Sequence, residues 1–98
     1  MNALVLKPFD PADYLDDDIA MVEYLACALE TSDPKFIADA LGVVARAKGM
    51  KQLAQESGLS RESLYKSLSE NGNPELSTLM KVLNALGITL TAKMPRTT

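Results

Sequence analysis

The side chains best suited to chemistry in this chain lie on one short segment, residues 60–66. Its polar members are Ser60, Arg61, Glu62, Ser63, Tyr65 and Lys66. Leu64 and Leu68 lie one helical turn apart, so a helix here would bury its leucines and expose its polar side chains. An arginine can donate two hydrogen bonds to a guanine edge, and tyrosine or lysine can reach phosphate. The segment therefore predicts a helix that reads the major groove of DNA.

The residues before this segment complete a helix-turn-helix pattern. Ala54 is small enough for a second helix to cross close to it, and Gly58 can adopt the positive φ that ends a helix. Ser60 can then cap the next helix through its hydroxyl. The pattern predicts two helices, at residues 50–57 and 61–71, joined by a tight turn. A surface helix of a protein-interaction module is the alternative interpretation.

Cations also lie just ahead of the first helix of this pattern. The cations are Arg46, Lys48 and Lys51, and with the amide side chain of Gln52 they complete the predicted DNA-binding set. Cations at such a position can contact phosphates. They can equally stabilise the carboxyl end of the helix that precedes the motif. We favour phosphate contact.

Charge is divided unevenly along the chain. Residues 1–45 hold two basic and nine acidic residues, a net charge of −7, whereas residues 46–98 hold eight and four, a net charge of +4. Some acids serve as helix caps, but capping does not explain why bases are scarce in the first half. The division predicts that one end faces an anionic partner and the other a cationic partner.

The sequence contains few residues that are suited to catalysis. The chain has no His and a single Cys, Cys27, which excludes Ser-His catalysis and Cys/His zinc sites. Asp16, Asp17 and Asp18 could be imagined around Mg²⁺, but adjacent side chains at a helix start diverge, and capping is the favoured interpretation. We expect no enzyme activity, no cofactor, no metal ion and no small-molecule ligand.

Hydrophobic periodicity over the 98 residues predicts a single all-α domain of about five helices. A short helical turn should cover residues 11–15, and Asp-Pro or acidic starts should open helices near residues 16 and 33. Gly49 should end the second of these, and Pro74 should open a last helix that Gly87 closes. The buried stripe expected for the helix opened at residue 16 is Ile19, Val22, Leu25, Ala26 and Leu29.

The pattern changes to a period of two near the end of the chain. Residues 88–94 alternate apolar and polar side chains and predict a strand, whose apolar face is Ile88, Leu90, Ala92 and Met94. A lone strand needs a partner. It could pair with a short strand at residues 3–7 or, across a two-fold axis, with its own copy. We expect a homodimer with these four residues at its interface.

No apolar run approaches the roughly 20 residues that a membrane span needs. The first residues lack the basic region and cleavage site of a signal peptide, and one Cys cannot form an internal disulfide. We therefore expect a cytoplasmic protein with no membrane partner.

Three stretches of the chain carry a resemblance to a known family: Phe9-Asp10-Pro11-Ala12-Asp13-Tyr14-Leu15, Ala45-Arg46-Ala47-Lys48-Gly49-Met50 and residues 58–74. The chain resembles the helix-turn-helix antitoxins, or antidote proteins, of bacterial addiction modules. The resemblance is to the HigA-like group encoded beside RelE/ParE-superfamily toxins, and it covers nearly the whole chain. It implies a λ-repressor-like bundle that neutralises a small, basic, mRNA-cleaving toxin. It also implies a dimer that represses its own operon by binding operator DNA.

These implications divide the chain by role. Residues 1–45 would contact the toxin, residues 46–87 would form the DNA-binding core and residues 88–94 would form the dimer strand. The residues expected to contact the toxin are Leu4, Leu6, Phe9, Tyr14, Asp16, Asp17 and Asp18. Two alternatives are a stand-alone transcription regulator without a toxin and an interaction module that has lost DNA binding.

Overall fold

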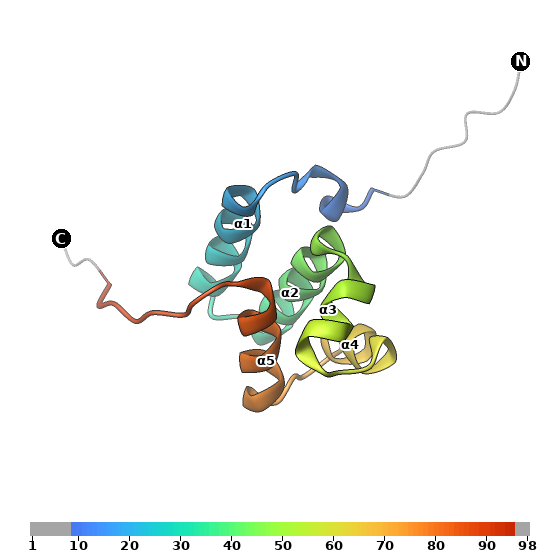
Figure 1. Ribbon diagram of the computed structural model, residues 1–98. Coiled ribbons are helices and arrows are strands. Elements are labelled where there is room, and N and C mark those ends of the chain that lie inside the picture. Colours follow the sequence, from blue (N-terminus) through green and yellow to red (C-terminus); the bar gives the residue numbers. More distant parts are fainter. Residues whose placement is uncertain (1–8, 96–98) are drawn as a thin grey trace, which may run out of the picture.

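A computed structural model describes residues 9–95 of the chain. It contains a short 3-10 helix, η1 (Pro11–Tyr14), and five α-helices: α1 (Asp18–Glu30), α2 (Pro34–Lys48), α3 (Met50–Ser57), α4 (Arg61–Ser67) and α5 (Leu76–Leu86). In Figure 1, α2 lies in the middle of the molecule, with α1 on one side and the α3–α5 group on the other. The described part of the chain is all-α, as predicted.

Side-chain caps begin the helices where the sequence predicted them. The Asp17 carboxylate accepts a hydrogen bond from the backbone N–H of Ala20 at 2.8 Å and opens α1. Asp33 accepts one from the N–H of Lys35 at 3.0 Å and opens α2. Each cap satisfies a backbone donor that the helix itself leaves free.

The core is organised around α2. Its central residues are buried on several faces, and they are Ala38, Ala40, Leu41, Gly42, Val43, Val44 and Ala45. Leu25 of α1, Leu53 of α3 and Leu64 of α4 are at most 2% exposed and join the same hydrophobic cluster. Small residues let α1, α3 and α4 approach α2 from different directions, whereas α5 packs mainly against α3.

The closest of these approaches is at Gly42. A Cβ atom built on Gly42 would collide with the backbone carbonyl oxygen of Leu68, which follows the last turn of α4. Leu68 itself is 3% exposed. The end of α4 is therefore seated directly on the backbone of α2.

The predicted buried stripe of α1 was largely wrong. Of its five residues only Leu25 is buried, while Met21 and Ala28 take the other buried positions. Ile19 is 71% exposed and Val22 is 46% exposed. The helix is apolar around most of its circumference, so periodicity could not select which apolar face would meet α2.

The helix α4 is shorter than predicted, because it ends at Ser67 instead of Asn71. The Ser67 hydroxyl donates to the carbonyl of Ser63 at 2.8 Å, and the Ser69 hydroxyl donates to the carbonyl of Lys66 at 3.2 Å. Such side-chain bonds compete with the helix for its backbone groups. The following helix α5 begins at Leu76, two residues later than the expected start at Pro74.

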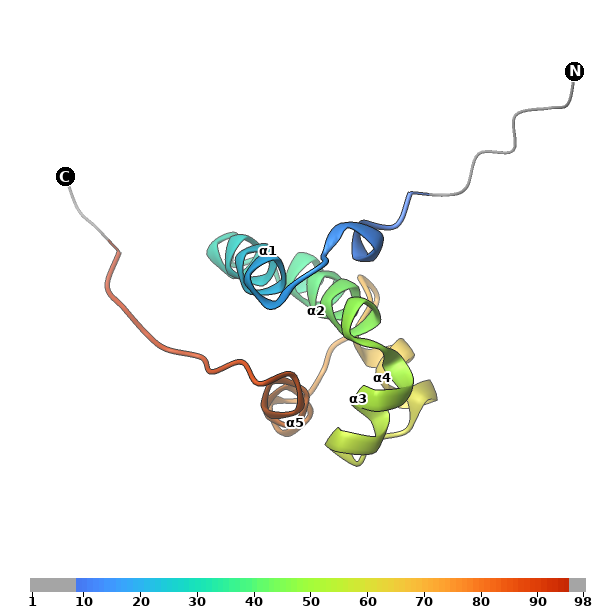
Figure 2. The ribbon, with the colours of Figure 1, turned by 45° about the horizontal axis from the view of Figure 1, so that its top comes forward.

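The predicted strand at residues 88–94 is absent from the part of the chain that the structure describes. These residues run as an extended segment away from the helices (Figures 1 and 2). Ile88 anchors the segment, because its N–H donates to the carbonyl of Leu83 at 2.9 Å and its side chain packs against the core. The expected strand at residues 3–7 lies outside the described residues. No helix within residues 9–95 is long and apolar enough to cross a membrane.

The contact at Gly42 yields a stability prediction. Alanine normally stabilises a helix interior by roughly 0.5–1 kcal/mol relative to glycine. Gly42→Ala should instead lower the free energy of unfolding by about 1–3 kcal/mol, because its Cβ forces α2 and α4 apart. Chemical denaturation followed by circular dichroism would measure the change. A variant as stable as the wild type would show that the two helices do not touch here.

Candidate nucleic-acid interface

The turn between α3 and α4 has the geometry that its sequence predicted. Gly58 ends α3 in the left-handed conformation, with φ 76° and ψ 10°, and its N–H donates to the carbonyl of Ala54 at 3.0 Å. The hydroxyl of Ser60 then accepts a hydrogen bond from the N–H of Ser63 at 3.0 Å and opens α4. Leu59 lies between them and packs against the core. Two short helices are thus joined by a turn with little freedom.

The helix α4 divides into a buried and an exposed face as expected. Leu64 is fully buried, whereas every predicted DNA-binding residue of this helix and its cap is exposed: Ser60, Arg61, Glu62, Ser63, Tyr65 and Lys66. On α3, Lys51 and Gln52 are also exposed, and the Gln52 amide donates to the Glu56 carboxylate at 3.1 Å. One side of the motif therefore offers amide, hydroxyl and cationic groups to solvent.

Most of these cations have no carboxylate to neutralise them. Within residues 9–95 the single ion pair joins Arg46 to Asp10. Lys51, Arg61 and Lys66 form none in that range, so their charges are available to an external anion. If the helix-turn-helix binds DNA, the phosphates of the DNA backbone are the anions that these cations would meet.

Arg46 is placed differently from the other cations of the predicted set. Its Nη2 donates to Asp10 Oδ1 at 2.9 Å and its Nε donates to Oδ2 at 3.3 Å, across 36 residues of sequence. The arginine hydrogen bond, followed by one from the N–H of Ala12, holds the pKa of Asp10 below its usual range. The same bond to Asp10 raises the pKa of Arg46. Arg46 therefore fastens η1 to the end of α2, while Lys48 beside it is half-buried.

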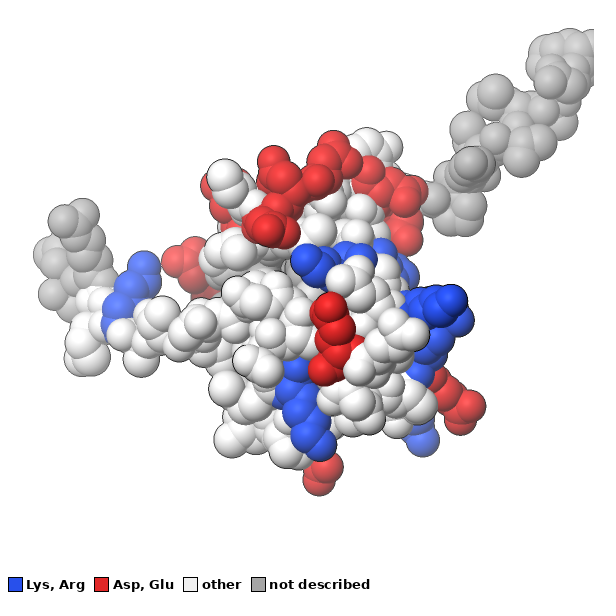
Figure 3. Space-filling model, viewed as in Figure 1, with Lys and Arg blue, Asp and Glu red and all other residues white. Residues whose placement is uncertain are grey.

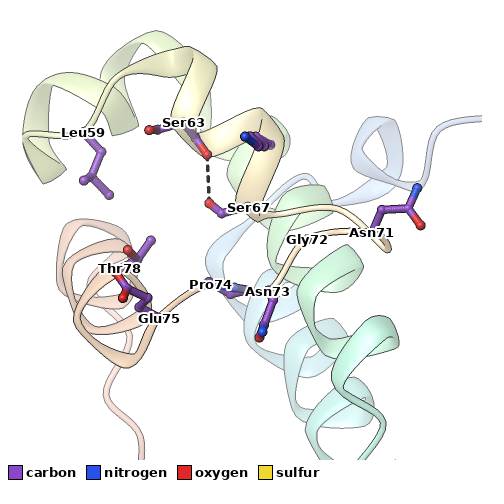
Figure 4. Close-up of a pocket in the computed structure, with 10 residues that line it drawn as sticks. Leu59, Ser63, Ser67, Asn71, Gly72, Asn73, Pro74, Glu75 and Thr78 are labelled. Atoms are coloured by element: carbon purple, nitrogen blue, oxygen red, sulfur yellow. Dashed lines mark hydrogen bonds between the residues drawn. The ribbon is translucent and has the colours of Figure 1, made fainter.

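A hollow behind α4 adds polar residues that the sequence analysis missed. It lies between α4 and the start of α5, and Figure 4 shows Ser63 and Ser67 on one side and Glu75 and Thr78 on the other. Asn71 and Asn73 belong to the loop that lines it. A Cβ atom on Gly72 would strike the Ser67 carbonyl, so this loop folds back tightly on the end of α4. For this loop, residues 71–74, the sequence predicted only that one helix ends and the next begins.

The acidic end lies apart from the helix-turn-helix. Figure 3 shows acidic side chains gathered along the top of the molecule, where η1 and the start of α1 lie. Asp16, Asp17 and Asp18 are exposed, and no group of three or more metal-ligating side chains occurs among residues 9–95. The rings of Phe9 and Tyr14 stack with their centroids 5.3 Å apart, and both side chains are more than 60% exposed. Leu4 and Leu6 lie outside the described residues.

Comparison with known proteins identifies the family. Residues 5–94 match the model of a family described as "Probable addiction module antidote protein". The chain belongs to this antidote family. It is also 42% identical over 91 residues to an uncharacterized protein of Haemophilus influenzae, across 93% of this chain and 94% of the relative. No solved structure matches the chain.

Membership of the antidote family confirms the broad prediction of an antitoxin and implies a toxin as partner. Antidote proteins are regulatory and non-enzymatic, as the sequence analysis expected. The family assignment extends over all five α-helices, so the helix-turn-helix and the acidic end belong to the same antidote unit.

The bond between Arg46 and Asp10 yields a pH prediction. The pKa of the Asp10 carboxyl should lie below 3.8 in the wild type and rise toward that value in Arg46→Gln. Because the folded-state pKa is lowered, the bond stabilises η1 on α2 above pH about 4 and is lost as the pH falls through the folded pKa. An NMR titration of the Asp10 carboxyl carbon in both proteins would measure both values. Identical titrations in the two proteins would contradict the assignment.

Proposed function

We propose that this antidote protein is the antitoxin of a type II toxin–antitoxin module. It binds and neutralises a cognate RelE/ParE-like toxin in the cytoplasm. As a homodimer it also represses its own operon by binding operator DNA through α3 and α4. The observation that carries the proposal is the combination of antidote-family membership with a helix-turn-helix whose second helix exposes cations that form no ion pair within residues 9–95.

The dimensions of α4 support DNA binding. An α-helix with its side chains is about 10–12 Å across and fits the B-DNA major groove, which is about 12 Å wide. The seven residues of α4 make about two turns, enough to present a short row of side chains to the groove. Arg61 lies in the first turn, at the end from which recognition helices contact bases. Lys51 and Lys66 lie on α3 and α4 and would contact the phosphates on either side, as would polar groups of the loop at Asn71 and Asn73. The λ-repressor-like docking mode is part of this proposal.

The charge and exposure of the first half support toxin binding. A toxin that acts on mRNA needs a basic surface to hold its substrate. Asp16, Asp17 and Asp18 are exposed and follow Tyr14 closely in the sequence, and Tyr14 stacks on Phe9, so this segment offers both acidic groups and exposed aromatic rings. Charges of this kind mainly set the association rate, whereas apolar anchors set the lifetime of a complex.

Operator binding can be tested with Arg61→Ala. Loss of a bidentate base contact should weaken binding to the DNA upstream of the gene by about 1–3 kcal/mol, with little effect on random DNA. Lys51→Ala should weaken both DNAs alike and reduce the salt dependence. Lys35→Ala, in the first turn of α2 and outside the helix-turn-helix, is the matched control and should change neither affinity. Fluorescence anisotropy would measure each; wild-type affinity in Arg61→Ala would remove α4 from the reading role.

Toxin binding can be tested by neutralising three acids at once. Asp16, Asp17 and Asp18 changed to Asn should slow association with the product of the adjacent gene by about tenfold at low salt, with a smaller effect on dissociation. Asparagine caps helices as well as aspartate does, so α1 should keep residue 17 as its N-cap. The control removes three acids elsewhere: Glu56, Glu70 and Glu75 changed to Gln. Surface plasmon resonance would measure both rate constants, and equal association rates would place the toxin site elsewhere.

A further inference from the structure

An apolar stripe on α1 is only partly covered by the rest of the described chain. It consists of Ile19, Val22, Ala26 and Leu29, which recur at helical spacings of three and four residues and are all exposed. Exposed fractions of 71%, 46% and 38% for Ile19, Val22 and Leu29 are high for residues that share one helix face. A regular stripe of this kind is typical of a helix that packs against another surface.

The extended tail, residues 88–95, has the same lack of cover. Ile88 is packed against the core, but Leu90 is 39% exposed and Met94 is 88% exposed. The tail starts beside the stripe, because Ile88–Thr91 line a shallow hollow together with Val22, Ala26 and Leu29. Beyond Thr91 the tail runs away from its own helices (Figure 2), so residues 92–95 leave the outer side of the stripe of their own chain exposed.

The two surfaces are complementary in charge. The helix α1 carries Asp18, Glu23 and Glu30 and no basic residue. Helical geometry places Glu23 and Glu30 along one edge of the stripe, next to Ile19 and Ala26. Two α1 stripes packed on each other would bring these acids together, which disfavours that arrangement. The tail, by contrast, carries Lys93 and no acid.

The two surfaces also match in length. An extended chain from Leu90 to Met94 covers about 13 Å, and the helical stripe from Ile19 to Leu29 covers about 15 Å. The alternating tail would place Leu90, Ala92 and Met94 on the stripe and Lys93 on the opposite face. From there the long, flexible Lys93 side chain would reach back to the acids along the edge of the stripe.

We propose that the α1 stripe is covered by residues 90–94 of a second copy of the chain. The exchange is reciprocal, so a two-fold dimer buries both stripes and both tails in one closed arrangement. This inference rests on the homodimer in the proposed function and gives it an interface between two helical domains. The partner's tail is the occupant, and neither a second α1 helix nor the toxin covers the stripe.

A charge introduced into the stripe should disrupt the dimer. Ala26→Arg should raise the dimer dissociation constant at least about tenfold, a loss of roughly 1.4 kcal/mol, measured by sedimentation equilibrium. The matched control is Cys27→Arg, because Cys27 is exposed on the same helix but points about 100° away from Ala26. Circular dichroism would verify that both variants fold. A dimer equally strong in both variants would overturn the inference.

A charge exchange tests the identity of the occupant. Glu23→Lys and Lys93→Glu should each weaken the dimer by about threefold to tenfold, and the double variant should recover most of the loss. Glu70→Lys, the same change on the loop after α4, should have no effect. If the double variant dimerised no more strongly than the single variants, the tail would not be the occupant of the stripe. The same conclusion would follow if Ala26→Arg kept the wild-type dimer dissociation constant but no longer bound the toxin.

These outcomes are separable from those of the proposed function. A wild type that dimerises through the stripe but does not bind the upstream DNA would overturn operator binding alone. A wild type that remains monomeric at all concentrations would overturn the interface. A dimer that binds the upstream DNA but is indifferent to Ala26→Arg would retain the proposed function and remove the interface assigned here.

Discussion

The contact between α2 and the end of α4 at Gly42 is the constraint on which the rest of the molecule depends. Isolated helices of seven or eight residues are not stable in water, so α3 and α4 need a surface to fold against. The small and buried residues of α2 provide that surface, and Gly42 allows the backbone of Leu68 to lie directly on it. The orientation of the exposed face of α4 is thus set by its packing on α2, which is not part of the helix-turn-helix.

Much of the fold could be predicted because its signals are local. Asp17, Asp33 and Ser60 each bond a backbone N–H within three residues, and Gly58 ends its helix through its own conformation. The failures had different causes. In α1 nearly every side is apolar, so the pattern could not fix the buried face. After Ser67, side-chain hydroxyls bond to helical carbonyl groups and the helix ends early. Residues 88–94 have no neighbouring strand within the described residues, and an alternating pattern alone does not supply one.

The candidate site divides in the same way. The exposed face of α4 follows directly from the spacing of Leu64 and Leu68, so its polar residues could be named from the sequence. The bond between Asp10 and Arg46 spans 36 residues and left no local signal, although it separates Arg46 from the other predicted phosphate contacts. The polar loop behind α4 was also missed, since Asn and Gly in succession indicate a turn without showing what the turn approaches. The roles of these residues in DNA, toxin and dimer contacts stay predictions.

The junction of α2 and α3 has a mechanical consequence. Gly49 alone separates the two helices: its N–H closes α2 on the carbonyl of Ala45 at 2.9 Å, and its own carbonyl accepts the N–H of Leu53 at 3.0 Å in α3. A linker of one residue that is hydrogen-bonded to both helices allows little relative motion, so α2 and α3 behave as one rigid, bent unit. The ion pair between Asp10 and Arg46 attaches the segment at η1 to this unit three residues before Gly49. A displacement of η1 would therefore be passed through α2 to α3 as a change of tilt, because no flexible hinge lies between the two helices.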